Sequence, residues 1–77
     1  MNVIVRFADG SEPRTIEAIT APEALRQVGR ADAYVAIRCV GGYELLQFCP
    51  ETQRFSSTLG NSVSQAFETL FDGEATS

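Results

Sequence analysis

The chain has 77 residues, the size of one small domain, with no room for a second. Hydrophobic residues make up 44% of it and charged residues 21%, which is typical of a folded globular protein rather than a disordered one. Six basic residues, all arginine, stand against ten acidic ones, and the formal charge of −4 argues against broad binding to nucleic-acid phosphates.

The absence of histidine excludes several classes of site. Without histidine the chain cannot form a Ser-His-Asp or Cys-His catalytic group, and it has no histidine to bind a metal. Two cysteines are too few for a Cys₄ zinc site. No apolar run approaches the roughly 18 residues that span a membrane, and residues 1–6 begin as a strand rather than as a signal peptide. We therefore expect a cytoplasmic protein without metal or cofactor, and catalysis is the least expected activity.

The first predicted unit is a β-hairpin. Residues 3–7 are β-branched or aromatic at alternate positions, as in a strand with one buried face. Asp9-Gly10 is a dipeptide preferred in two-residue hairpin turns, where both central residues need positive φ. A return strand over about residues 12–19 completes this unit.

A short helix is predicted next. Thr20 and Glu23 have the spacing of a capping box, and Pro22 falls in the first turn, where its missing N–H costs nothing. Gly29 ends the helix. Its apolar stripe consists of Ala21, Ala24, Leu25 and Val28.

A second hairpin is predicted over residues 34–49, with Gly41-Gly42 as its loop. In that register Val40 lies opposite Tyr43, Arg38 opposite Leu45, Ile37 opposite Leu46 and Val35 opposite Phe48. The core face then carries Val35, Ile37, Cys39, Leu46 and Phe48, with Glu44 at its end. The other face carries Tyr34, Ala36, Arg38, Val40, Tyr43, Leu45 and Gln47. A slip by one residue would exchange the two faces.

The last third of the chain is predicted as a loop and a helix. Residues 50–60 are polar and loop-like, although residues 53–56 could add a short edge strand. Ser62 and Gln65 resemble another capping box and begin the second helix, which Gly73 ends. Its apolar stripe consists of Val63, Ala66, Phe67, Leu70 and Phe71. Residues 74–77 are expected to form a frayed tail.

These elements predict one α+β domain over residues 1–73. The order is ββαββα, in a two-layer sandwich with an antiparallel sheet of about four strands and both helices on one face. The expected core consists of Val3, Val5, Phe7, Ile16, Leu25, Val28, Val35, Ile37, Leu46, Phe48, Val63, Phe67, Leu70 and Phe71. The other face of the sheet is left open.

The two cysteines are expected to remain free thiols. In the predicted register Cys39 and Cys49 lie on opposite faces of the hairpin, so their side chains point apart. Nothing near them in the sequence would make either a strong nucleophile, since Arg38 points away from its neighbour Cys39.

The open face is the strongest candidate for a functional surface. Arg6, Tyr34, Arg38 and Tyr43 would lie on it among aliphatic side chains, and arginine with tyrosine is typical of protein interfaces. Phe55, in the polar loop, is a further candidate contact. The alternatives are an ordinary half-exposed sheet face and a Phe55 folded over the core edge.

In length, acidity and compact α/β layout the chain resembles anti-CRISPR proteins, the small inhibitors encoded by phages and mobile elements. The resemblance implies an inhibitor that binds a host protein or ribonucleoprotein complex and blocks nucleic-acid access or nuclease recruitment. The resemblance assigns no function to any individual residue of this chain.

We predict a non-enzymatic protein-binding module. Its contacts would come from Arg6, Tyr34, Arg38, Tyr43 and Phe55. Direct nucleic-acid binding is not expected, because the chain is acidic and lacks lysine. A small structural or regulatory homodimer and an acidic mimic of nucleic acid are the alternatives.

Overall fold

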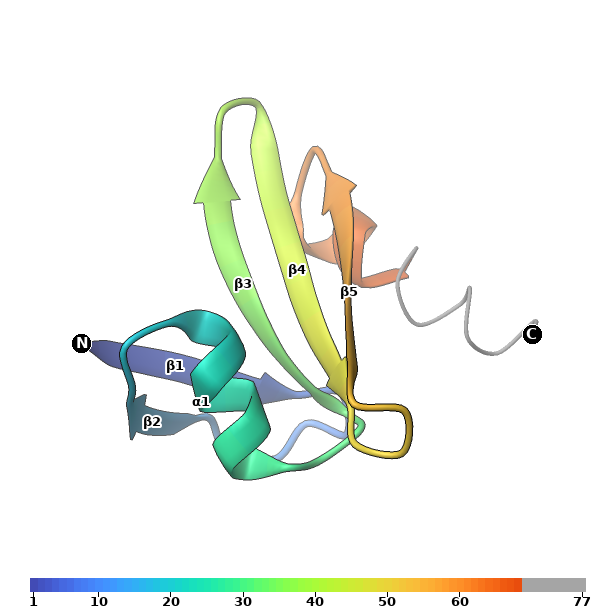
Figure 1. The fold of residues 1–77 in the computed structure, drawn as a ribbon. Coiled ribbons are helices and arrows are strands. Elements are labelled where there is room, and N and C mark those ends of the chain that lie inside the picture. Colours follow the sequence, from blue (N-terminus) through green and yellow to red (C-terminus); the bar gives the residue numbers. More distant parts are fainter. Residues whose placement is uncertain (69–77) are drawn as a thin grey trace.

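The computed structural model describes residues 1–68. Its elements are β1 (Asn2–Phe7), β2 (Arg14–Glu17), α1 (Ala21–Val28), β3 (Ala33–Cys39), β4 (Gly42–Cys49) and β5 (Arg54–Gly60), followed by helical residues 63–68. The strands pair antiparallel in the order β2-β1-β3-β4-β5 (Figure 1). The α+β class is as predicted, but the sheet has five strands. The strand β5 replaces most of the loop predicted over residues 50–60. The predicted helix end at Gly73 and the tail 74–77 lie outside the described residues.

The two helical segments cover opposite faces of the sheet, so the predicted arrangement with both on one face is wrong. Figure 1 shows α1 in front of the sheet and residues 63–68 behind it. The core under α1 consists of Val3, Val5, Phe7, Ala18, Ala24, Leu25, Ala33, Val35 and Phe48. The smaller core on the other face consists of Tyr34, Leu45 and Ala66, with Ala36 and Phe67 packed against it. The physical reason is that the face predicted to be open is itself apolar enough to require cover.

The second hairpin turns one residue earlier than predicted. Arg38 lies opposite Tyr43 and Cys39 opposite Gly42, so the loop is Val40-Gly41. Gly41 has φ of 83°, whereas Gly42 belongs to β4, where an added Cβ would collide with the carbonyl oxygen of Gly60. Each strand partner is thereby shifted by two residues from its predicted position. Because side chains alternate with a period of two, the two predicted faces survive this shift.

The first hairpin has a wider loop than predicted. β1 and β2 pair from Asn2 opposite Glu17 to Val5 opposite Arg14, which leaves residues 8–13 as the connection. Of the dipeptide expected to form a two-residue turn, only Gly10 has positive φ (84°). The β1–β2 ladder ends at Val5, and the last two residues of β1, Arg6 and Phe7, pair only with β3 on the other edge of the strand.

The predicted start and end of α1 are confirmed. The backbone N–H of Glu23 donates to Oγ1 of Thr20 at 3.4 Å, and the N–H of Gly29, with φ of 68°, donates to the carbonyl of Leu25 at 3.0 Å. The predicted start of the second helix is confirmed as well, since the N–H of Gln65 donates to Oγ of Ser62 at 3.1 Å. These caps satisfy backbone groups that a helix terminus leaves without partners.

Candidate functional site

A cavity of about 480 Å³ opens on the sheet face that residues 63–68 partly cover. Its lining consists of Ile4, Arg6, Tyr34, Ala36, Tyr43 and Val63. We call it the Arg6 cavity. Strands β1, β3 and β4 and the second helical segment all contribute to it, so it depends on the tertiary fold and not on one segment of the chain.

The Arg6 cavity brings together three of the five predicted interface residues. Arg6 is exposed and Tyr43 is half-buried. Tyr34 is only 9% exposed, and its ring meets the ring of Phe67 edge-on at 5.6 Å, so most of its surface serves packing. Arg38 is exposed and lies directly opposite Tyr43 on the same face. Together, Arg6, Arg38 and Tyr43 form an accessible surface at the Arg6 cavity.

The fifth predicted residue, Phe55, lies apart from the others. It belongs to β5 and packs against the core under α1, with 4.7 Å between its ring centroid and that of Phe48. The guanidinium carbon of Arg26 lies 5.7 Å from the same ring. Phe55 is therefore folded over the edge of the core, which was the alternative to its being a contact residue.

A second cavity, of about 390 Å³, lies between β1 and β3 and beside the start of α1. We call it the β1–β3 cavity. Its lining consists of Met1, Asn2, Val3, Ile4, Ala21, Val35, Ala36 and Ile37. It shares Ile4 and Ala36 with the Arg6 cavity. No pattern in the sequence predicts this cavity, because it arises where two strands that are distant in the sequence diverge.

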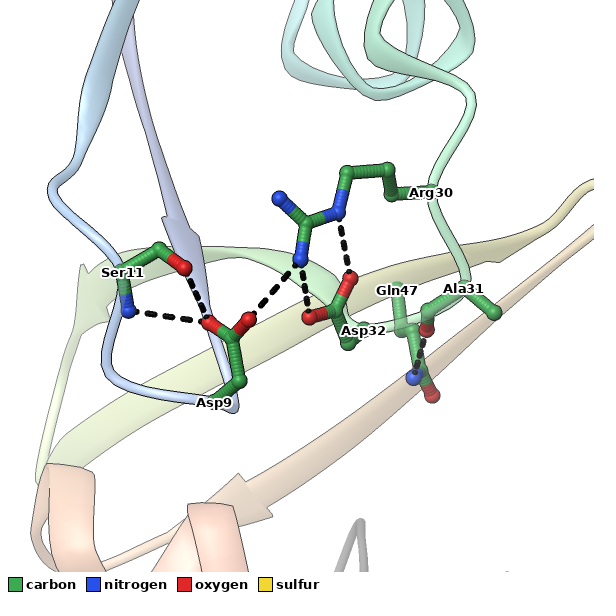
Figure 2. Close-up of polar contacts among 6 residues, drawn as sticks. All are labelled: Asp9, Ser11, Arg30, Ala31, Asp32 and Gln47. Atoms are coloured by element: carbon green, nitrogen blue, oxygen red, sulfur yellow. Dashed lines mark hydrogen bonds and ion pairs between the residues drawn. The ribbon is translucent and has the colours of Figure 1, made fainter.

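A polar cluster joins the loop after β1 to the loop after α1 (Figure 2). Arg30 holds Asp32 through two hydrogen bonds, Nε to Oδ1 at 2.9 Å and Nη2 to Oδ2 at 2.6 Å, and also holds Asp9 at 3.1 Å. Its guanidinium stacks 4.2 Å from the ring centroid of Phe7. Hydrogen bonding to Asp32 raises the pKa of Arg30, and hydrogen bonds from the hydroxyl and N–H of Ser11 lower that of Asp9. Every charged group here has a partner, which indicates a structural clamp between two loops.

The buried side chain of Gln47 makes a similar connection from the sheet. It is 2% exposed, and its Nε2 donates to the carbonyl of Ala31 at 2.5 Å (Figure 2). This bond ties β4 to the segment that precedes β3. The amide nitrogen therefore satisfies a backbone carbonyl, and Gln47 lines neither of the two cavities.

The two cysteines are free thiols, as predicted, but their surroundings differ. Cys39 is exposed near the hairpin loop. Cys49 begins a tight turn in which the N–H of Gln53 donates to its carbonyl at 2.8 Å. Hydrogen bonds from the hydroxyl and N–H of Thr52, and from the N–H of Glu51, lower the pKa of the Cys49 thiol. That neither thiol is a strong nucleophile stays a prediction; the turn residue Thr52, three positions after Cys49, is the neighbour that the sequence pattern did not connect with this thiol.

Within residues 1–68 no three His, Cys, Asp or Glu side chains are grouped closely enough to hold a metal ion. No helix in this described part of the chain is long and apolar enough to cross a membrane. Comparison with protein-family models, curated proteins and solved structures found no match to the chain.

Proposed function

We propose that the chain is a non-enzymatic protein-binding module that uses the Arg6 cavity and the adjoining Arg38 as its contact surface. The composition of this surface carries the proposal. Arginine and tyrosine dominate the binding energy of many interfaces because they combine large contact area with directional hydrogen bonds. Neither Arg6 nor Arg38 forms an ion pair within residues 1–68. Both guanidinium groups can therefore bind acceptors of a partner.

The resemblance to anti-CRISPR proteins supplies the more specific form of this proposal. In that form the partner is a host protein or ribonucleoprotein complex in the cytoplasm, and binding blocks its access to nucleic acid or its recruitment of a nuclease. The net charge of −4 favours a protein surface over a phosphate backbone as the direct contact.

The test is quantitative capture from a lysate of the native host with the tagged full chain. Changing Arg38→Ala together with Tyr43→Ala should weaken retention of a stoichiometric partner about tenfold or more, as for other interface hot spots. The thermal midpoint should stay within a few degrees, because neither side chain belongs to a buried core. Arg14→Ala, on the opposite face of the sheet, should bind as the unchanged chain does.

Two outcomes would contradict the proposal, namely full retention by the double variant and the absence of any stoichiometric partner. In the second case, a dimer mass by light scattering would favour self-association through the same surface. Binding that falls steeply with salt but survives the loss of Tyr43 would favour mimicry of nucleic acid.

A further inference from the structure

The sheet is split between β1 and β3. These strands pair only at Arg6 opposite Tyr34 and Phe7 opposite Ala33. A continued ladder would place Ile4 opposite Ala36, but the two strands diverge before that point (Figure 1). Within residues 1–68, two strand edges in the middle of the sheet thus have no paired strand over most of their length. Such edges can pair with another extended chain.

The free edge of β1 follows from the hydrogen bonds at the N-terminus. Met1 and Ala18 exchange two bonds of 3.0 Å, so the backbone groups of Met1 face β2. Because N–H and C=O groups alternate in direction along an antiparallel strand, those of Asn2 and Ile4 face β3. Within residues 1–68, neither of these two residues belongs to a ladder on that side.

The free edge of β3 follows in the same way. The N–H of Ala8 donates to the carbonyl of Asp32 at 2.9 Å, so Asp32 faces β1. Alternation then directs the backbone groups of Ala36 and Arg38 toward β1 as well. The ladder between β3 and β4 lies on the other edge of β3 and does not use the backbone groups of Ala36 and Arg38. The split is therefore bordered by backbone donors and acceptors on both strands.

The two cavities meet at this split, where Ile4 and Ala36 line both. The Arg6 cavity lies on the face of Tyr43 and Val63, whereas the β1–β3 cavity spans the split and extends to the face of Val35, beside Ala21 of α1. Side chains of an extended segment alternate between the two faces of a sheet. A strand placed in the split would therefore direct alternate side chains into the two cavities.

The linings differ in a way that selects these side chains. The β1–β3 cavity is mostly apolar, whereas the other contains Arg6, which has no ion-pair partner in the described part of the chain. Among the described residues, no carboxylate lines either cavity. An aliphatic side chain fits the first lining, and an acidic side chain fits the second.

We propose that the split is a docking site for an extended segment of a partner protein, which adds as a strand to the free edge of β3. Its side chains alternate between acidic residues that meet Arg6 and aliphatic residues that enter the β1–β3 cavity. Main-chain hydrogen bonds supply affinity and the two cavities supply specificity, as in other strand-addition complexes. This inference rests on the proposed function and specifies how the partner is held.

The outer edge of β5 is the competing site for such a segment. It is also a strand edge, but its exposed Ser56 and Ser57 line neither cavity. Ser57 pairs with Leu46 at a position where its N–H faces away from β4, so a proline there leaves the ladder intact. Ser57→Pro and Ala36→Pro are therefore matched variants, each of which removes one outward N–H from one edge.

The probe is a displayed library of random ten-residue peptides selected against the full chain. Synthetic copies of the enriched peptides are then measured by fluorescence anisotropy and by amide shifts of the ¹⁵N-labelled protein. Enriched peptides should alternate Asp or Glu with Val or Ile, and should shift the amides of Ile4, Ala36 and Arg38. Ala36→Pro should weaken binding about tenfold or more, and Ser57→Pro should leave it unchanged.

Arg6→Glu, a surface change that leaves both cores intact, is a second variant that does not depend on tolerance of a proline. This variant should weaken the binding of acidic peptides about tenfold or more. Failure to enrich any peptide, shifts confined to β5, or full binding by both Ala36→Pro and Arg6→Glu would overturn the proposal. A partner that is captured equally well by the chain and by Ala36→Pro, but is lost from the Arg38→Ala, Tyr43→Ala double variant, would overturn strand addition alone and leave the protein-binding function standing.

Discussion

The ring of Phe67 packs edge-on against the ring of Tyr34, with 5.6 Å between the centroids and 67° between the planes. This contact seats residues 63–68 on the sheet face opposite to α1. The same segment contributes Val63 to the Arg6 cavity. The shape of the proposed interface therefore depends on how closely this helical segment approaches β5.

Gly60 permits that approach, and Gly60→Ala should disrupt it. An added Cβ would lie 2.6 Å from the backbone nitrogen and 2.9 Å from the Cα of Ala66, neither of which can move without displacing the helix. We expect a loss of about 1–3 kcal/mol in the free energy of unfolding, measured in urea, as for other overpacked sites. Ser57→Ala, at an exposed position of the same strand, should change it by less than about 0.5 kcal/mol. Equal stability of the two variants would mean that the helix is not seated against Gly60.

The clamp around Arg30 should weaken in acid. Because Ser11 lowers the pKa of Asp9 in the folded chain, the ionised carboxylate stabilises the fold at neutral pH. That contribution is complete above the unfolded pKa of about 4 and is lost as the pH falls through the lower folded value. The difference in thermal midpoint between the unchanged chain and Ser11→Ala should therefore be constant above about pH 5 and shrink below about pH 4. A difference that stays the same down to pH 2 would contradict this role of Ser11.

The Cys49 thiol should ionise below the ordinary value for cysteine. The main cause is the hydrogen bond from the Thr52 hydroxyl, which stabilises the thiolate. In a Cys39→Ser background, the rate of alkylation by iodoacetamide is followed against pH. Its midpoint should lie below about 8.5 and should rise in Thr52→Val but not in Thr52→Ser. A midpoint unaffected by Thr52→Val would show that the hydroxyl does not act on the thiol.

Signals within a few residues of each other predicted local structure well. Thr20 with Glu23, Gly29, and Ser62 with Gln65 all cap helices at the positions that their spacing indicates. The alternation of side chains in β3 and β4 also predicted which residues share a face. These features depend on backbone groups of neighbouring residues, so one segment of sequence contains most of the information.

Features that depend on packing between distant segments were not predictable in the same way. Residues 50–60 were predicted to form a polar loop with at most a short edge strand over residues 53–56, yet residues 54–60 pair with β4 along their whole length. Their polar side chains show no alternation that would indicate a strand with one buried face. The placement of the second helix depends on Gly60, whose significance appears only beside Ala66. Among the candidate site residues, Arg6 and Tyr43 share a cavity because β1, β3 and β4 are neighbours in the sheet, whereas Phe55 lies opposite Phe48 on the other face.

Amide hydrogen exchange of the free chain tests the central claim, a sheet split between β1 and β3, most directly. The N–H groups of Val35 and Ile37 face β4 and should exchange slowly, whereas those of Ala36 and Arg38 face the split and should exchange faster. On addition of an enriched peptide, Ala36 and Arg38 should become protected. Slow exchange of all four amides in the free chain would mean that β1 and β3 form a continuous ladder, and would contradict the split and the docking site built on it.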